Sequence, residues 1–264
     1  MNRTSWLIAA FITAVLVAGV YWYQHRRPGA PASENGPAPA VAASAAPPPQ
    51  QHYPVPETPQ IPAPPPLPTL DESDRPLVEA LAQALGPGVE SFLIPRALIR
   101  HLVATVDSLD RTAPVPLRLR PLPPTPGVPA VETINGGLYL SAANAERYRP
   151  FVDALKAADM AKLAAVYFRY YPLFQKAYED LGYPGGYFND RLIQVIDHLL
   201  VAPQVQGPLA VAQPHVLYQY ADPQFEALSW GQKTLLRLGP DNEAVVKDQL
   251  RALRKAIVAN KPSP

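Results

Sequence analysis

The chain has 264 residues, of which 48% are hydrophobic and 17% charged, and its formal net charge is +1. Without cysteine it can form neither a disulfide nor a thiol-based catalytic centre. Residues 69–264 contain 20 basic and 20 acidic side chains and no basic cluster. Because a nucleic-acid-binding surface must be positive to displace counterions from phosphates, no nucleic-acid partner is expected.

The first element is an apolar run from Trp6 to Tyr23 that contains no charge and one polar side chain, Thr13. As a helix it would rise about 27 Å, close to the hydrocarbon thickness of a bilayer. Its terminal aromatic residues suit the two membrane interfaces. We therefore expect residues 1–27 to be a transmembrane anchor. The alternative is a cleaved signal peptide, which the weak small-residue site near Ala18 disfavours.

The charges that flank residues 6–23 leave the orientation open. Arg3 precedes the run and Arg26 and Arg27 follow it, so the positive-inside rule slightly favours a cytoplasmic C-terminus. A short N-terminal tail followed by a long tether is, however, the usual organisation of a bacterial signal anchor. The interpretation is a single-pass protein of the bacterial inner membrane with a periplasmic domain, whose partner is an envelope protein or peptidoglycan.

Residues 28–68 form a Pro/Ala-rich tract with 15 prolines, 9 alanines and only two charged residues, Glu34 and Glu57. Such a tract has too few large apolar groups to offset its ordering entropy. Polyproline II geometry would give a contour of at most about 125 Å. We expect a flexible tether that does not pack; a PxxP ligand for an SH3-like partner is the alternative.

Helical signals dominate residues 69–264, which have room for one single-core domain. Apolar spacing, N-caps and Gly-Pro breaks predict the following helices: Ser73 to about Leu85; Pro95 to Leu109; 142–157 with a break near Pro150; 160–181, capped by Asp159 and kinked at Pro172; Asp190 to about Val201; a helix opened by a Ser229–Gln232 capping box and ended by Gly239-Pro240; and a last helix from about Asn242 with a buried stripe of Val246, Leu250, Leu253 and Ile257.

A Pro-rich arm, residues 111–140, interrupts the helices. It contains VETI and GLYL, which favour short strands, and VLYQY at 216–220 is a third candidate strand. The predicted fold class is therefore mainly α: a single-span helix, a tether, and one multi-helix domain with a minor β arm.

Several segments together resemble one bacterial family. They are LPTLDESD (67–74), HLVATVDSL (101–109), RYRPFVDAL (147–155), YYPLFQKAYEDLGYP (170–184), FNDRLIQVIDHLL (188–200) and QKTLLRLGPDN (232–242). The sequence is similar to membrane-anchored proteins that carry the domain of unknown function number 3014, over nearly all of residues 67–258. The resemblance implies a domain unit in a bacterial envelope setting, and it brings no activity and no functional residues.

The usual catalytic signatures are missing from the sequence: it has no HExxH, GxSxG, GxxxxGK[ST] or GxGxxG. His101, His198 and His215 have no second ligand at a metal-binding spacing, so no metal or cofactor is expected. Glu179 or Asp180 paired with Asp190 is the one carboxylate arrangement that would suit a cell-wall glycan hydrolase, the alternative to a binding role.

The run GYPGGYFNDR, residues 182–191, looks most like a site. Gly182 suits the left-handed end of a helix, with Tyr183 placed to contact Tyr178. Asn189 suits the N-cap of the next helix, where Phe188 would staple onto Ile193. The run is thus a helix–helix corner whose tip is a candidate ligand contact, with four candidate binding residues: Tyr183, Tyr187, Phe188 and Arg191.

Aromatic residues recur on the helix before this corner. Tyr167, Tyr171, Phe174 and Tyr178 share one helical face. We expect a core stripe rather than a platform for glycan or peptide rings. The leading hypothesis is a non-catalytic envelope protein whose tethered helical domain binds another envelope component.

Overall fold

The computed structural model describes residues 52–55 and 65–259, all of them in one compact unit. The predicted anchor, residues 1–27, lies outside these ranges, as does most of the predicted tether. Among the residues that the structure describes, none of the helices has the length and apolar character needed to cross a membrane.

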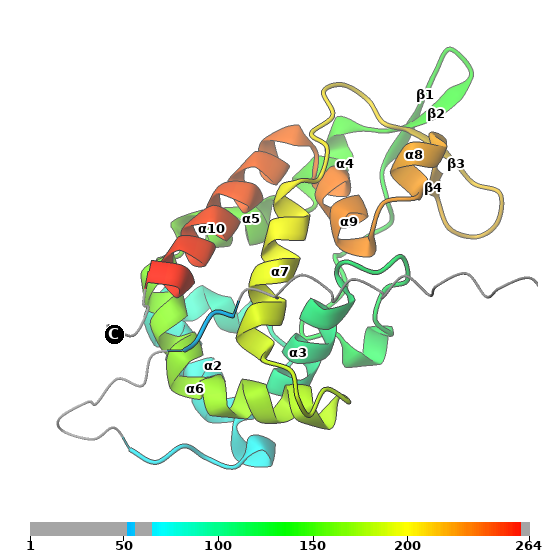
Figure 1. The fold of residues 1–264 in the computed structure, drawn as a ribbon. Helices are drawn as coiled ribbons and strands as arrows, with labels where there is room; N and C mark the ends of the chain where they lie inside the picture. The colour runs from blue at the N-terminus through cyan, green and yellow to red at the C-terminus, as the bar shows by residue number, and fades with distance from the viewer. Residues whose placement is uncertain (1–51, 56–64, 260–264) are drawn as a thin grey trace, which may run out of the picture. The chain divides into compact units, whose positions relative to one another are not determined.

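Helices make up most of the described domain, so the predicted mainly α class is confirmed (Figure 1). The α-helices are α2 Asp74–Leu85, α3 Leu98–Ser108, α4 Ala142–Glu146, α5 Arg149–Ala157, α6 Met160–Asp180, α7 Phe188–Leu200, α8 Pro223–Glu226, α9 Trp230–Leu238 and α10 Pro240–Ala259. Short 3₁₀ helices are η1 Leu70–Glu72, η2 Pro87–Phe92 and η3 Leu117–Leu119.

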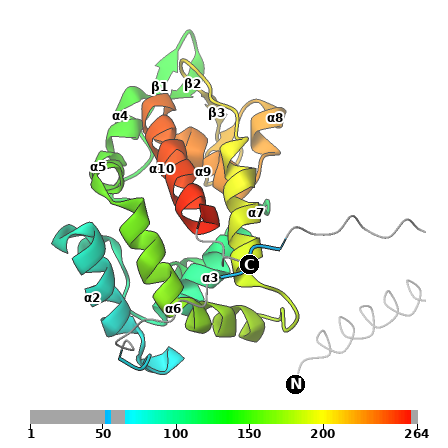
Figure 2. The same cartoon turned by 60° about the vertical axis from the view of Figure 1, so that its left-hand side comes forward.

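The long helix α6 is the centre of the packing, because α2, α3 and α10 all contact it. Asp159 caps it as predicted, accepting hydrogen bonds from the backbone N–H groups of Ala161 and Lys162. Pro172 lies inside the helix, and Figure 2 shows α6 changing direction along its length, as the predicted kink requires. Helix α7 then packs between α3 and α10.

The aromatic stripe of α6 belongs to the main core, as predicted. Tyr167, Phe174 and Tyr178 are buried, and Tyr171 is partly buried against the same cluster. The ring of Phe174 stacks on that of Phe188 from α7, with centroids 5.7 Å apart. The stripe therefore fixes α7 on α6 and cannot act as an open ring platform.

A small antiparallel sheet with strand order β1-β2-β3-β4 forms the minor β part. Its strands are β1 Val131–Ile134, β2 Gly137–Leu140, β3 Ala210–Ala212 and β4 Gln219–Tyr220. The turn Asn135-Gly136 joins β1 to β2 with φ of 49° and 83°, the left-handed values of a tight hairpin. The two predicted arm strands are confirmed, whereas β3 was not expected. Of the strand predicted at 216–220, only the last two residues form a strand, β4.

Several predicted helix starts differ in detail. Ser73 does not cap α2 with its side chain; its hydroxyl donates to the carbonyl of Leu70 instead. The helix predicted from Pro95 begins at Leu98, because Ala97 adopts a left-handed φ of 48°. The carboxylate of Asp74 then accepts from the N–H groups of Ala97 and Leu98 and so caps α3 from another helix.

The last helix carries an ion pair within its buried face. Val246, Leu250, Leu253 and Ile257 contact the cores as predicted. Glu243 and Lys247 are buried on the same helix, with Lys247 Nζ 2.7 Å from Glu243 Oε1 and 2.6 Å from the carbonyl oxygen of Ala202. Hydrophobic spacing alone could not show this pair.

Candidate functional site

The α6–α7 corner, residues 181–190, has the predicted helix-ending geometry. Gly182 has φ of +116°, and its N–H donates to the carbonyl of Glu179 over 3.0 Å, while the N–H of Tyr183 points to the carbonyl of Tyr178 at 3.4 Å. The rings of Tyr178 and Tyr183 stack with centroids 4.6 Å apart. A Cβ at Gly186 would lie 3.0 Å from the Tyr178 ring, so this glycine leaves room for the stack.

Helix α7 starts differently from the prediction. It begins at Phe188, whose N–H donates to Gln175 Oε1 over 2.9 Å, and Gln175 Nε2 donates to the carbonyl of Gly186 over 2.8 Å. The Gln175 side chain of α6 thus binds the main chain of the corner at both Gly186 and Phe188. Asn189 lies inside the first turn, so the predicted Asn189 N-cap is wrong, and so is the N′ position that the staple assigned to Phe188.

Because Asn189 is not a cap, its side chain is used elsewhere. Its Oδ1 accepts from the hydroxyl of Tyr167 over 3.0 Å, which orients its Nδ2 toward the carbonyl oxygen of Tyr53, 2.8 Å away. The N–H of Tyr53 donates to Asp190 Oδ1 over 2.7 Å. Two neighbouring side chains of α7 therefore satisfy both main-chain polar groups of one residue in the predicted tether.

His52 makes two further contacts, one with the Asp190 carboxylate and one with the Tyr187 ring. Its Nδ1 lies 2.8 Å from Asp190 Oδ2, and its ring lies on the ring of Tyr187 with centroids 4.2 Å apart. The Tyr53 side chain packs against the main core. The extended segment 52–55, blue in Figures 1 and 2, is thus bound through its main chain and two rings. We call its contact surface on Tyr187, Asn189 and Asp190 the segment site.

This packing departs from the expectation that residues 28–68 do not pack. Tyr53 and Leu67 both contact the main core, and Arg169 donates to the carbonyl of Pro65 over 3.2 Å. Tyr53 and Leu67 bring large apolar side chains, whose burial stabilises docking more than that of proline or alanine.

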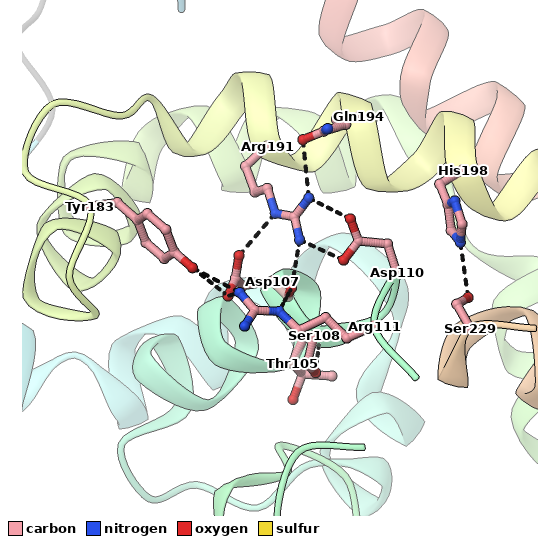
Figure 3. Close-up of polar contacts among 10 residues, drawn as sticks. All are labelled: Thr105, Asp107, Ser108, Asp110, Arg111, Tyr183, Arg191, Gln194, His198 and Ser229. Carbon is pink, nitrogen blue, oxygen red and sulfur yellow. Dashed lines mark hydrogen bonds and ion pairs between the residues drawn. The ribbon is translucent and has the colours of Figure 1, made fainter. Parts of the chain in front are cut away.

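A charged network lies behind the corner, between α3 and α7 (Figure 3). Arg191 Nε is 2.9 Å from Asp107 Oδ1, and its Nη1 and Nη2 bind both carboxylate oxygens of Asp110 at 2.7 and 2.6 Å. Arg111 Nη2 lies 2.5 Å from Asp107 Oδ2 and 2.8 Å from the hydroxyl of Tyr183. We call Asp107, Asp110, Arg111, Tyr183 and Arg191 the Arg191 network.

The electrostatics of the Arg191 network match its geometry. The hydrogen bond from Arg191, aided by its charge, lowers the pKa of Asp110 although burial opposes this. Burial by itself would lower the pKa of Arg191, but the hydrogen bonds and charges of Asp110 and Asp107 raise it. The hydrogen bond with Tyr183 and the charge of Asp107 raise the pKa of Arg111. Two cations balance two anions, so the network leaves no net charge for a ligand.

The four predicted binding residues therefore lie in three different environments. Tyr183 and Arg191 belong to the Arg191 network, and Tyr187 is 54% exposed and contacts the bound segment. Phe188 is only 1% exposed, so its ring is not open to a ligand in this structure. Its ring completes the α6–α7 core because α7 starts two residues earlier than the capping pattern suggests.

The carboxylates proposed for a hydrolase are engaged in separate interactions. Glu179 Oε1 accepts from Gln175 Nε2 over 3.1 Å, whereas Asp190 binds the segment at Tyr53 and His52. In residues 52–55 and 65–259, no group of three histidine or acidic side chains is placed to hold a metal ion.

A serine–histidine pair joins α7 to α9. His198 Nε2 lies 2.9 Å from Ser229 Oγ (Figure 3), and the same oxygen accepts from the N–H of Gln232 over 3.2 Å. Gln232 Nε2 donates to the carbonyl of His198 and not back to Ser229, so half of the predicted capping box forms. Ser229 is 6% exposed and serves as a helix cap, which suits a structural junction better than a nucleophile.

Comparison with protein families bears on the same region. The family described as "Protein of unknown function (DUF3014)" matches residues 98–254, which include α3, α6, α7 and the whole Arg191 network. The chain belongs to this family. Neither the curated proteins nor the solved structures that were compared contain a match. The sequence resemblance is thus confirmed at the level of the domain.

Sequence reasoning found the corner but missed what binds there. Tyr53 is the only aromatic residue and His52 the only histidine between residues 28 and 68, a signal that could have marked them. Asp107 and Asp110 lie three positions apart at the end of an apolar helix. Helical spacing would put both on one face, but α3 ends at Ser108, and the partner on α7 could be found only from the fold.

Proposed function

We propose that this chain is a non-catalytic binding protein of the bacterial cell envelope, whose helical domain recognises an extended polypeptide at the segment site. Residues 6–23 would hold it in the inner membrane, with the domain in the periplasm. The observation that carries the proposal is the pairing of Asn189 and Asp190 with the carbonyl and N–H of Tyr53.

The chemistry of the segment site favours a polypeptide partner over a glycan. An amide donor and a carboxylate acceptor face the C=O and N–H of a single residue, an arrangement that an extended main chain satisfies whatever its side chains. The exposed ring of Tyr187 offers a surface for one flanking ring. The partner we propose is therefore an extended segment of an envelope protein.

The groups around the segment site hold it in its binding geometry. Tyr167 fixes the amide of Asn189, Gln175 holds the corner, and Arg191 is bonded to Asp107 of α3. A site already held in this way loses less conformational entropy when a ligand binds.

The hydrolase alternative has less support from the contacts. A paired-carboxylate mechanism requires one carboxylic acid and one carboxylate that face a shared substrate. Asp190 instead accepts from Tyr53, and Glu179 accepts from Gln175, itself bonded to the main chain of the corner.

A photo-crosslinking amino acid at Tyr187 in the full chain tests the proposed partner in living cells. We expect an adduct whose crosslinked position lies in an extended segment of an envelope protein, and we expect Asp190→Ala to reduce it. The control position is Val201, which is 74% exposed at the other end of α7. Equal adducts at the two positions, or adducts with peptidoglycan alone, would contradict the proposal.

The proposed orientation has its own test. Alkaline phosphatase is active only outside the cytoplasm, so a fusion after Pro264 should be active. An inactive fusion, with activity from a fusion placed before residue 6, would contradict the periplasmic domain.

A further inference from the structure

The bound segment carries the ring side chains of the Pro/Ala tract. Between residues 28 and 68, His52 is the only histidine and Tyr53 the only aromatic residue. These two residues make the contacts with Tyr187, Asn189 and Asp190. A tether that only spans a distance needs no side chains beyond proline and alanine. The two rings therefore point to a specific binding role.

We propose that residues 52–55 are an intramolecular occupant of the segment site, which keeps the site closed to the envelope partner until that partner displaces them. This inference rests on the proposed function. It adds that the domain exists in a closed form, with its own segment bound, and an open form that binds the partner.

Covalent connection makes even a weak segment an effective occupant. Only nine residues, 56–64, separate the segment from the part of the domain that begins at Pro65. A connection this short gives an effective concentration on the order of 1 mM. If the segment binds with a dissociation constant of about 0.1 mM, the site is closed about ten times as often as it is open.

The contacts also define what can displace the segment. A competitor must be extended, must offer an N–H and a C=O at one residue to Asp190 and Asn189, and must place a ring on Tyr187. A hydrogen-bond donor on the preceding residue, placed as His52 Nδ1 is, would add a hydrogen bond to Asp190. The partner class is therefore an extended peptide with a ring-bearing donor residue before a large apolar residue.

The test uses the full chain and a labelled peptide with the sequence of residues 50–57, QQHYPVPE. A double variant, His52→Ala with Tyr53→Pro, removes the ring that contacts Tyr187, the Tyr53 ring that packs on the core and the N–H donor, and it leaves Tyr187, Asn189 and Asp190 unchanged. We expect this open variant to bind the peptide about tenfold more tightly than the unmodified chain, because its own segment no longer competes. Adding Asp190→Ala to the open variant should abolish the gain.

Two controls keep the test interpretable. Circular dichroism of each variant checks that the domain stays folded. Asp180→Asn replaces an exposed carboxylate that pairs with Lys176 at the same corner, and it should leave peptide binding unchanged.

Each outcome decides one of the two proposals. Equal binding by the unmodified chain and the folded open variant would overturn closure by the chain's own segment and leave the segment site supported. No binding by the folded open variant would overturn the segment site itself, and the closed form with it. A gain that Asp190→Ala does not remove would place the peptide elsewhere and overturn the inference.

Discussion

Replacing Arg191 by methionine tests whether the Arg191 network holds α7 on α3. The guanidinium makes three bonds to the carboxylates of Asp107 and Asp110 and one to the carbonyl of Asp107, and the Arg191 side chain is only 12% exposed. Breaking a buried pair costs about 3–5 kcal/mol because the remaining charge stays desolvated. Asp110 is 22% exposed and Arg111 still neutralises Asp107, so we expect a smaller loss, about 2–3 kcal/mol.

Equilibrium urea unfolding of the full chain, followed by circular dichroism, measures this loss. With a slope of about 2–3 kcal/mol/M, the midpoint should fall by about 1 M. Arg149→Met is the matched control, because Arg149 and Glu146 form an exposed pair with 62% and 56% exposed side chains. Its removal should change the unfolding free energy by less than about 0.5 kcal/mol. Equal midpoints for the two variants would refute the structural role of the network.

The stability difference between the unmodified chain and Arg191→Met should depend on pH in a definite direction. The folded-state pKa of Asp110 is lowered from its ordinary value of 3.8, chiefly by its hydrogen bond with Arg191. Its contribution is therefore present above pH 3.8 and is lost as the pH falls through the lower folded-state pKa. The stability difference between the unmodified chain and Arg191→Met should narrow only below pH 3.8; a difference that narrows between pH 7 and pH 5 would contradict this assignment.

Two further predictions concern the corner and the last helix. Gly182→Ala should destabilise the domain by about 1–3 kcal/mol, because φ at this residue is +116°. Gly185→Ala, in open space with no positive φ, should change stability by no more than about 1 kcal/mol, in the stabilising direction; equal losses in urea unfolding would contradict the account. Lys247→Met should cost about 3–5 kcal/mol by leaving Glu243 buried and unpaired. Adding Glu243→Leu should recover most of that loss, and a double variant as unstable as the single one would show that packing, not charge, is decisive.

Local signals predicted most helices because they act within a few residues. The Asp159 cap, the Gly182 helix end and the Tyr178–Tyr183 contact depend on neighbours in sequence, and the structure confirms all three. The apolar stripe of α6 likewise defined the core face.

The errors occur where a distant residue replaces a local partner. Asp74 caps α3 and Gln175 caps α7, so the starts predicted from Pro95 and Asn189 shifted. The segment site joins Tyr53 to Asp190 across 137 positions, and the Arg191 network joins Asp107 to Arg191 across 84. No local rule relates such positions, and their pairing follows only from how α3, α6 and α7 pack.

Amide hydrogen exchange at Tyr53 in the full chain tests the central claim most directly. The claim is that the segment site binds an extended main chain through Asp190 and Asn189. With a segment dissociation constant of about 0.1 mM, the closed form is about ten times as populated as the open form, so we expect the Tyr53 N–H to exchange about tenfold more slowly than in the free peptide QQHYPVPE. Asp190→Ala should restore the free-peptide rate. Exchange at that rate in the unmodified chain would contradict the claim.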